Sequence, residues 1–132
     1  MISILGVTGK SFLVAGLVLG ITLPFETAHA AKFHLLHVFQ GGSDGASPFG
    51  ALLKGTAVRY GTTYYGGTNN LGTVFQIARD GTESVVHSFT GGSDGANPQT
   101  GLIADAAGNL YGTTSAGGPS NCGTVFKVKP SG

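Results

Sequence analysis

Short apolar runs separated by glycine-rich stretches make up most of this chain. Residues 33–39 (FHLLHVF) and 83–89 (ESVVHSF) are rich in β-branched and aromatic side chains, which favour strands. Each run leads into Gly-Gly-Ser-Asp-Gly, where glycine allows positive φ and aspartate caps backbone amides, so a tight turn is expected. Beyond residue 30 no stretch has the spacing of an amphipathic helix. The pattern therefore predicts an all-β fold.

The chain contains two copies of one repeat. The block HVFQGGSDGASP at residues 37–48 returns as HSFTGGSDGANP at residues 87–98, and YGTT and GTVF recur in the same order. The later blocks lie one position further apart, so one residue is inserted in the second copy near residues 105–108. The expected strands are residues 33–39 and 83–89, 51–54 and 101–104, 58–63 and 109–114, and 72–77 and 123–128.

Each copy supplies four short strands over about fifty residues, which is the size of a β-propeller blade. The sequence therefore predicts β-propeller-like blades of about four antiparallel strands, in a first repeat at residues 33–83 and a second at 84–132. Propellers close with about four to eight blades, so this incomplete propeller would leave apolar faces and strand edges bare. Three outcomes follow: a ring of several copies, an open stack of sheets, or a piece of a longer array. We expect the last two together.

The start of the chain has the features of a secretory signal peptide. Lys10 precedes an apolar run at residues 12–25, and the small residues of Ala-His-Ala follow and end at Ala30. The run is short for a bilayer-spanning helix, so an uncleaved membrane anchor is the less favoured alternative. We expect a signal helix at residues 1–30, cleavage near Ala30, and export to the periplasm, the exterior or the cell surface.

Composition narrows the partners. Seven basic and six acidic side chains give a net charge of +1, so no field would recruit nucleic acid, and no nucleic-acid partner is expected. Twenty-four glycines and the absence of tryptophan are typical of a turn-rich β protein. Cys122 is the single cysteine, so an intrachain disulfide is excluded while pairing between chains stays open.

Three blocks of the second copy, HSFTGGSDGANP, GLIADAAGNLYGTT and CGTVFKVKPSG, resemble the repeat of the choice-of-anchor tandem-repeat family, the GloVer-type repeat of exported bacterial proteins. The resemblance implies an exported, propeller-like protein of many repeats, often with a sorting or anchoring segment, and it implies no catalytic residues. This chain has about two repeats and ends at Gly132 without an anchor, so we expect a truncated member of a longer array. Residues 54–57 replace the Asp-x-x-Gly-Asn turn, which predicts a degenerate first blade.

Two motifs suggest chemistry that their context does not favour. Gly-Gly-Ser-Asp-Gly matches the G-x-S-x-G nucleophile elbow, but that motif needs a following helix, so a turn is the better interpretation and no catalytic residue is expected. His37 and His87 occupy equivalent strand positions, one in each repeat, which favours structural histidines over a metal site.

A structural calcium ion is the alternative to having no cofactor. Asp44, Asp94 and Asn97 offer oxygen ligands in glycine-rich loops. Calcium takes about six to eight oxygens, and each loop supplies one carboxylate, so these three residues make only weak metal candidates.

The YGTT blocks supply the candidates for ligand binding. They carry hydroxyl groups but no acid or base, so they would suit a neutral ligand such as carbohydrate, and tyrosines packed between blades are the alternative. The candidate residues are Tyr60, Thr62, Thr63, Tyr111, Thr113 and Thr114.

The sequence thus predicts an exported, non-enzymatic β-propeller-type repeat protein that serves as a scaffold or binding surface. The alternative is a fragment of an exported carbohydrate-binding or hydrolytic propeller enzyme, although glycosidases usually need paired carboxylates and the acidic residues here fall in separate turns. A remnant without independent function is a third possibility. Other copies of the chain, further repeats of a longer chain and carbohydrate are the partners considered.

Overall fold

The computed structural model describes residues 31–130, so the expected signal helix and its cleavage site near Ala30 lie outside the described residues. The chain divides into two units, Met1–Lys32 and Phe33–Gly132, and the fold belongs to the second. That unit is all-β, with two short 3-10 turns as its helical elements. Within residues 31–130, no helix has the length and apolar character needed to cross a membrane.

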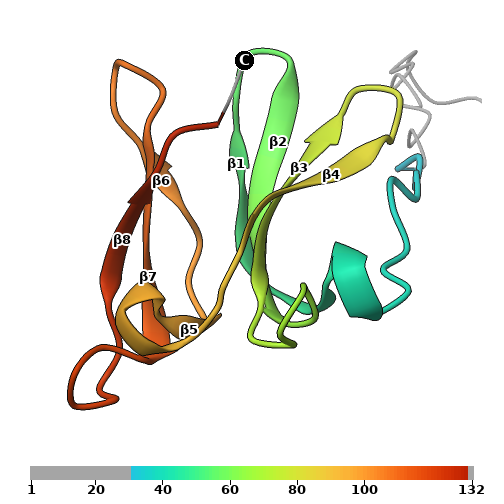
Figure 1. Ribbon diagram of the computed structural model, residues 1–132. Coiled ribbons are helices and arrows are strands. Elements are labelled where there is room, and N and C mark those ends of the chain that lie inside the picture. Colours follow the sequence, from blue (N-terminus) through green and yellow to red (C-terminus); the bar gives the residue numbers. More distant parts are fainter. Residues whose placement is uncertain (1–30, 131–132) are drawn as a thin grey trace, which may run out of the picture. The chain divides into compact units, whose positions relative to one another are not determined.

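The first sheet contains four antiparallel strands in the order in which they occur along the chain (Figure 1). They are β1 (Ala46–Lys54), β2 (Val58–Tyr65), β3 (Thr73–Ala78) and β4 (Glu83–Ser88). Each strand pairs with its neighbour in sequence, because the connections are tight turns. This sheet is formed largely by the first repeat, yet its fourth strand leads directly into the second.

The second sheet repeats the first with one strand position open. β5 (Ala96–Pro98) and β6 (Ile103–Ala104) both pair with β7 (Leu110–Ala116), where they take the place that β1 alone has in the first sheet. β8 (Val125–Val128) pairs with β7 as β3 pairs with β2. Among residues 31–130, β8 has no other strand partner, so the position equivalent to β4 is open.

The pairing register is duplicated together with the sequence. Equivalent pairs in the first and second sheets are Ala46↔Tyr65 and Ala96↔Ala116, Pro48↔Thr63 and Pro98↔Thr114, and Leu53↔Tyr60 and Ile103↔Tyr111. Register in a half-buried sheet is set by which side chains face the core, so equal patterns give equal registers. The predicted all-β fold with antiparallel four-strand sheets is confirmed.

Three local predictions were wrong. Residues 33–39 form no strand, because a strand needs a neighbouring edge and no sheet precedes them in the described part of the chain. The first strand begins at Ala46 rather than residue 51, since Pro48 is tolerated on the edge of a sheet. The first sheet is also complete rather than degenerate, with Gly55 N donating to Val58 O at 2.9 Å to close its first hairpin.

The Gly-Gly-Ser-Asp-Gly blocks are turns, as predicted. They form η1 (Gly42–Asp44) and η2 (Gly92–Asp94), each flanked by glycines with positive φ. A Cβ on Gly45 would lie 2.6 Å from Oγ1 of Thr63, so glycine is required there by the close approach of the strand as well as by its φ of 105°.

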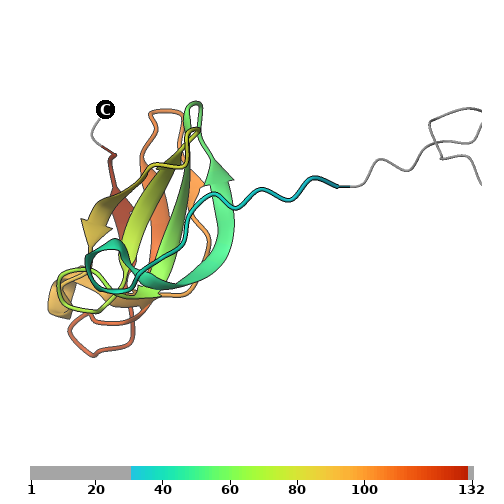
Figure 2. The same ribbon diagram turned by 90° about the vertical axis from the view of Figure 1, so that its right-hand side faces the viewer.

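The main core lies between the two sheets, which pack against each other in Figures 1 and 2. Val74 comes from the first sheet, and Leu102 and Leu110 come from the second copy. Phe89, in the segment that joins β4 to η2, completes this buried cluster and packs edge-to-face on Phe126 with ring centroids 5.1 Å apart. Apolar burial between the sheets therefore holds the two repeats together.

Candidate functional site

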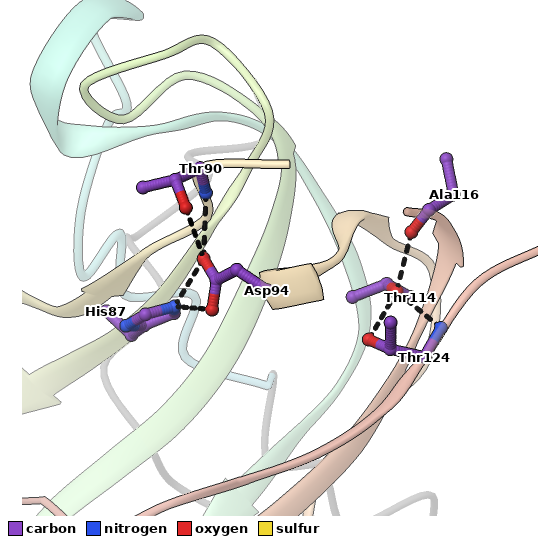
Figure 3. Close-up of polar contacts among 6 residues, drawn as sticks. All are labelled: His87, Thr90, Asp94, Thr114, Ala116 and Thr124. Atoms are coloured by element: carbon purple, nitrogen blue, oxygen red, sulfur yellow. Dashed lines mark hydrogen bonds and ion pairs between the residues drawn. The ribbon is translucent and has the colours of Figure 1, made fainter. Parts of the chain in front are cut away.

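A polar network ties the second loop to the strand before it. His87 Nε2, at the end of β4, lies 3.0 and 3.1 Å from the two carboxylate oxygens of Asp94 in η2 (Figure 3). The backbone N–H of Thr90 donates to the same carboxylate at 2.8 Å, and its hydroxyl does so at 3.1 Å. All these contacts join the end of β4 to η2, so they fix the path of the chain between the sheets.

The first copy has a looser form of this network. The backbone N–H of Gln40 donates to Asp44 at 2.8 Å, but His37 Nε2 lies 3.6 Å from that carboxylate, beyond hydrogen-bond distance. Glu83 lies close enough to interact with both groups. Burial raises the pKa of Glu83, an effect that His37 opposes and Asp44 reinforces. His87 is thus held by the carboxylate of Asp94, whereas His37 has only a looser contact with Asp44.

Buried threonine pairs pin neighbouring strands in both sheets. Thr63 Oγ1 lies 2.8 Å from Thr73 Oγ1, accepts the Thr73 N–H at 3.1 Å and contacts Tyr65 O at 2.8 Å. Thr114 makes the equivalent three contacts in the second sheet, with Thr124 and Ala116 (Figure 3). The hydroxyls of Thr63 and Thr114 are therefore engaged inside the fold.

Thr62 and Thr113 both contact Thr100, which lies between β5 and β6. Thr62 is buried, and its Oγ1 lies 3.0 Å from Thr100 O and 3.1 Å from Phe49 O, so it bridges the two repeats. Thr113 is exposed, and its hydroxyl lies 3.2 Å from that of Thr100. Of the four candidate threonines, the structure thus places one at the surface.

The two candidate tyrosines are half-buried. Tyr60 packs against the core between the sheets. The Tyr111 hydroxyl donates to Asp105 at 2.9 Å, and Lys127 Nζ lies 5.5 Å from the centre of its ring. Hydrogen bonds from the Asn109 side chain and backbone, the Tyr111 hydroxyl and the Ala107 N–H lower the pKa of Asp105 to about 2. This carboxylate therefore serves the turn between β6 and β7.

Within residues 31–130, a cluster of three aromatic side chains, two of them exposed, is found in the first copy and not in the second. Tyr65, 47% exposed, packs edge-to-face on Tyr64 with ring centroids 4.5 Å apart, and the exposed Phe49 lies 6.2 Å from Tyr64. Phe49 was missed from the sequence, although its replacement by Gln99 at the equivalent position of the second copy marks it as unusual.

A groove between the sheets was also missed. Its volume is about 480 Å³, and its lining includes Leu53, Thr56 and Tyr60 from the first sheet and Asp105 and Leu110 from the second copy. Periodicity could not have revealed it, because the groove depends on how far apart two hairpins stand.

The calcium candidates do not converge on one point. Asp94 faces His87 and Thr90, whereas Asn97 Nδ2 donates to Tyr64 O at 3.0 Å. Within residues 31–130, no group of three or more His, Cys, Asp or Glu side chains could hold a metal ion.

Cys122 is exposed and free, with its thiol 3.3 Å from Ser120 O.

Comparison with known proteins identifies the repeat. No curated protein and no solved structure matches the chain. A family model, the Gloeobacter/Verrucomicrobia repeat, matches residues 15–132. This match covers most of the chain and confirms the GloVer-type resemblance of its repeated blocks. The chain therefore belongs to the Gloeobacter/Verrucomicrobia repeat family.

Proposed function

We propose that the chain is an exported, non-enzymatic repeat protein whose propeller-like sheets form a scaffold or binding surface. One observation carries this proposal: in the second repeat, the polar side chains of the shared His–Asp and Thr–Thr pairs are engaged within the fold. Asp94 is held by His87 and Thr90, and Thr114 is held by Thr124. Repeated residues of this kind explain how the two sheets are built and joined.

The same contacts argue against an acyl-transfer site in the loops. A nucleophile needs a base within hydrogen-bond reach and a group that orients the base. His87 meets its carboxylate through Nε2, in a turn that leads into a strand rather than a helix. The G-x-S-x-G match thus serves the turn between β4 and β5.

Chromogenic esters, phosphates and glycosides would test for enzymatic activity. We expect the chain purified from an exporting bacterial host to show the same background turnover as the His87→Ala/Asp94→Asn variant. Thr90→Ala, which removes only one hydroxyl from the network, is the matched control. Turnover that is present in the parent chain and lost in the double variant would contradict a non-enzymatic role.

Export is supported by the apolar run at residues 12–25 and by the family to which the chain belongs. Mass spectrometry of the periplasmic and secreted fractions should find a chain that begins at Ala31. A full-length chain that stays in the cytoplasm would overturn this part of the proposal.

Carbohydrate binding is the second candidate function, favoured by the aromatic cluster of Phe49, Tyr64 and Tyr65, of which Phe49 and Tyr65 are exposed. Aromatic rings present flat apolar faces that suit sugar rings. Affinity electrophoresis in gels that contain soluble polysaccharides should then show retardation that Tyr65→Ala abolishes and Thr113→Ala, at a second exposed candidate position, leaves unchanged. Equal mobility in all polysaccharides would exclude this candidate.

A further inference from the structure

The junction between the two sheets shows how one repeat completes another. β4 pairs with β3 and finishes the first sheet, with Val74 opposite His87 and Phe75 opposite Val85. The chain then passes through Phe89 into η2 and enters the second sheet. One continuous segment therefore closes one sheet and opens the next.

Residues 33–38 stand in the same relation to η1 but have no sheet to close. They precede Phe39 as β4 precedes Phe89, and Phe39 packs on Phe75 as Phe89 packs on Phe126. Yet residues 33–38 form no strand, and four of their side chains, Phe33, Leu35, Leu36 and Val38, are exposed large hydrophobics. This segment is an apolar strand sequence without a partner.

In the described part of the chain, the second sheet lacks the strand that such a segment could supply, because the position equivalent to β4 is open. β8 is equivalent to β3, but among residues 31–130 it pairs only with β7, so one edge is open. Val125 on this strand is 81% exposed, whereas its equivalent Val74 is fully buried. An open edge next to an exposed apolar side chain invites pairing with another strand.

The outer face of each sheet is equivalent to one of the two faces that pack against each other inside the chain. Leu102 and Pro98 of the second copy are buried, while the equivalent Leu52 and Pro48 are exposed. We call the face with Leu52 the leading face of the first sheet, and the face with Val125 the trailing face of the second. Within the chain, a leading face packs on a trailing face, so a second copy could repeat that contact.

The backbone at Ser47 in the first sheet has the same conformation as the equivalent Asn97, which contacts the neighbouring sheet inside the chain. Asn97 has φ 56°, and its N–H donates to Leu71 O of the first repeat at 2.8 Å. The equivalent Ser47 has φ 54°, which is uncommon for a residue other than glycine, and Cys122 stands at the position of Leu71. Ser47 could thus donate to Cys122 O of another copy without rearranging its backbone.

We propose that residues 33–38 of one copy pair with β8 of another copy as the fourth strand of its second sheet, with the leading face of the first copy packed on the trailing face of the second. Figure 1 shows the two segments on opposite outer sides of one molecule, residues 33–38 beyond β4 and β8 beyond β7, so the pairing joins different copies. The internal register transfers as Val38↔Thr124, His37↔Val125, Leu35↔Phe126, His34↔Lys127 and Phe33↔Val128.

This inference deepens the scaffold function, on which it rests, by naming a second copy of the chain as what the scaffold binds. The contact is head-to-tail, so it closes into a ring or extends as a filament. A closed ring of four to eight blades corresponds to about two to four copies. A net charge of +1 per copy gives little repulsion between them.

The first experiment measures solution mass by light scattering on a sizing column. We expect the chain to elute at a multiple of its own mass and Leu35→Asp to elute as a monomer with unchanged far-UV circular dichroism. Leu35 is 66% exposed, so the substitution spares the fold of one copy. Ala107→Asp, at an exposed residue in the turn between β6 and β7 and outside the strands of both surfaces, should keep the multiple mass.

A second experiment tests the register. In a Cys122→Ser background, His34→Cys and Lys127→Cys proteins are mixed and oxidised. Paired residues on neighbouring strands stand close enough for a disulfide, so we expect a crosslinked dimer of one chain of each kind. Leu35→Cys mixed with Lys127→Cys is the matched control, because a shift of one residue turns the side chain to the opposite face.

Each outcome of these two experiments either supports or overturns the pairing between copies. An oligomer that Leu35→Asp dissociates, with crosslinking at least tenfold stronger for the His34 pair than for the Leu35 pair, supports the proposal. Filaments that show the same crosslinking preference support an open form of the same contact. A folded monomer at all concentrations overturns pairing between copies, points to a further repeat as the occupant, and leaves the scaffold function standing. Aggregates that ignore both changes also overturn the pairing, whereas catalytic turnover would refute the scaffold function itself.

Discussion

The same leucine occurs at equivalent positions of the two repeats and has two different environments. Leu102 is 6% exposed because the first sheet covers it, whereas Leu52 is 44% exposed on the leading face. Val74 and Val125 show the reverse, with the first-copy residue buried and the second-copy residue exposed. Local sequence therefore sets strand, register and face, while burial depends on which sheet lies next to that face. Equivalent substitutions in the two repeats separate these two contributions, and the Leu35→Asp monomer is the background so that contacts between copies do not interfere.

The largest difference should come from truncating the two leucines. Leu102→Ala removes a buried side chain from the core between the sheets and should lower the free energy of unfolding by about 2–5 kcal/mol. Leu52→Ala should cost less than about 1 kcal/mol, because much of this side chain already meets water. Chemical denaturation of both variants makes the comparison, and equal losses would show that the sheets do not pack as described.

A smaller effect is expected from adding a methyl group under equivalent aromatic rings. A Cβ on Gly112 would lie 2.5 Å from Phe126 Cζ, and one on Gly61 would lie equally close to Phe75 Cζ. Gly112→Ala should cost about 1–3 kcal/mol, because its neighbour Leu102 is held between the sheets. Gly61→Ala should cost at least as much, since the ring that its Cβ meets belongs to Phe75, which is 2% exposed, whereas Phe126 is half-buried. Thermal unfolding measures both, and a clearly smaller loss for Gly61→Ala would contradict this account.

The difference in stability loss should be smaller still for substitutions in the two loop networks, at Asp94 and Asp44. Asp94→Ala removes a carboxylate that accepts bonds from His87 and Thr90, and it should destabilise the fold by about 1 kcal/mol, because the site is partly exposed. Asp44→Ala should cost less than Asp94→Ala, since it loses the bond from the Gln40 N–H but no bond from His37, which lies beyond hydrogen-bond distance. Urea titrations of the two variants provide the test, which fails if the order is reversed.

The smallest expected effect is the loss of folding stability at acidic pH. Hydrogen bonds from Asn109, Tyr111 and Ala107 hold the folded-state pKa of Asp105 at about 2, below its usual value of 3.8. Its stabilising contribution is therefore complete above about pH 4 and is lost as pH falls towards 2. Glu83 acts in the opposite sense, because its raised pKa favours folding as the group becomes protonated. A Glu83→Gln background isolates Asp105. Stability in that background should fall between pH 4 and 2, and Asp105→Asn should flatten the fall; an unchanged pH profile in the Asp105→Asn variant would be inconsistent with this assignment.

Much of the fold could be predicted, because strand propensity, turn residues and the repeat are local properties. The strands around Thr62 and Thr113 and the turns at Asp44 and Asp94 were all placed correctly from such signals. Residues 33–39 were not, although their composition favours a strand. A strand is completed by a neighbouring edge, and the sequence of one segment does not contain its neighbour.

Less of the candidate site could be predicted. Thr62, Thr63 and Thr114 were chosen because hydroxyl groups suit neutral ligands, and the structure buries all three in contacts within the fold. Spacing shows which residues share a face of a strand but not what covers that face. Phe49 could have been found by comparing the copies, since its equivalent is Gln99.

The central claim is that residues 33–38 and β8 are two halves of one strand pair between copies. Backbone hydrogen exchange tests it most directly, by comparing the parent chain with Leu35→Asp at equal concentration. The claim predicts slower exchange in the parent chain for both residues 33–38 and the outward amides of β8, with no change in β2. Equal rates in the two proteins, or slowing of only one of the two segments, would contradict it.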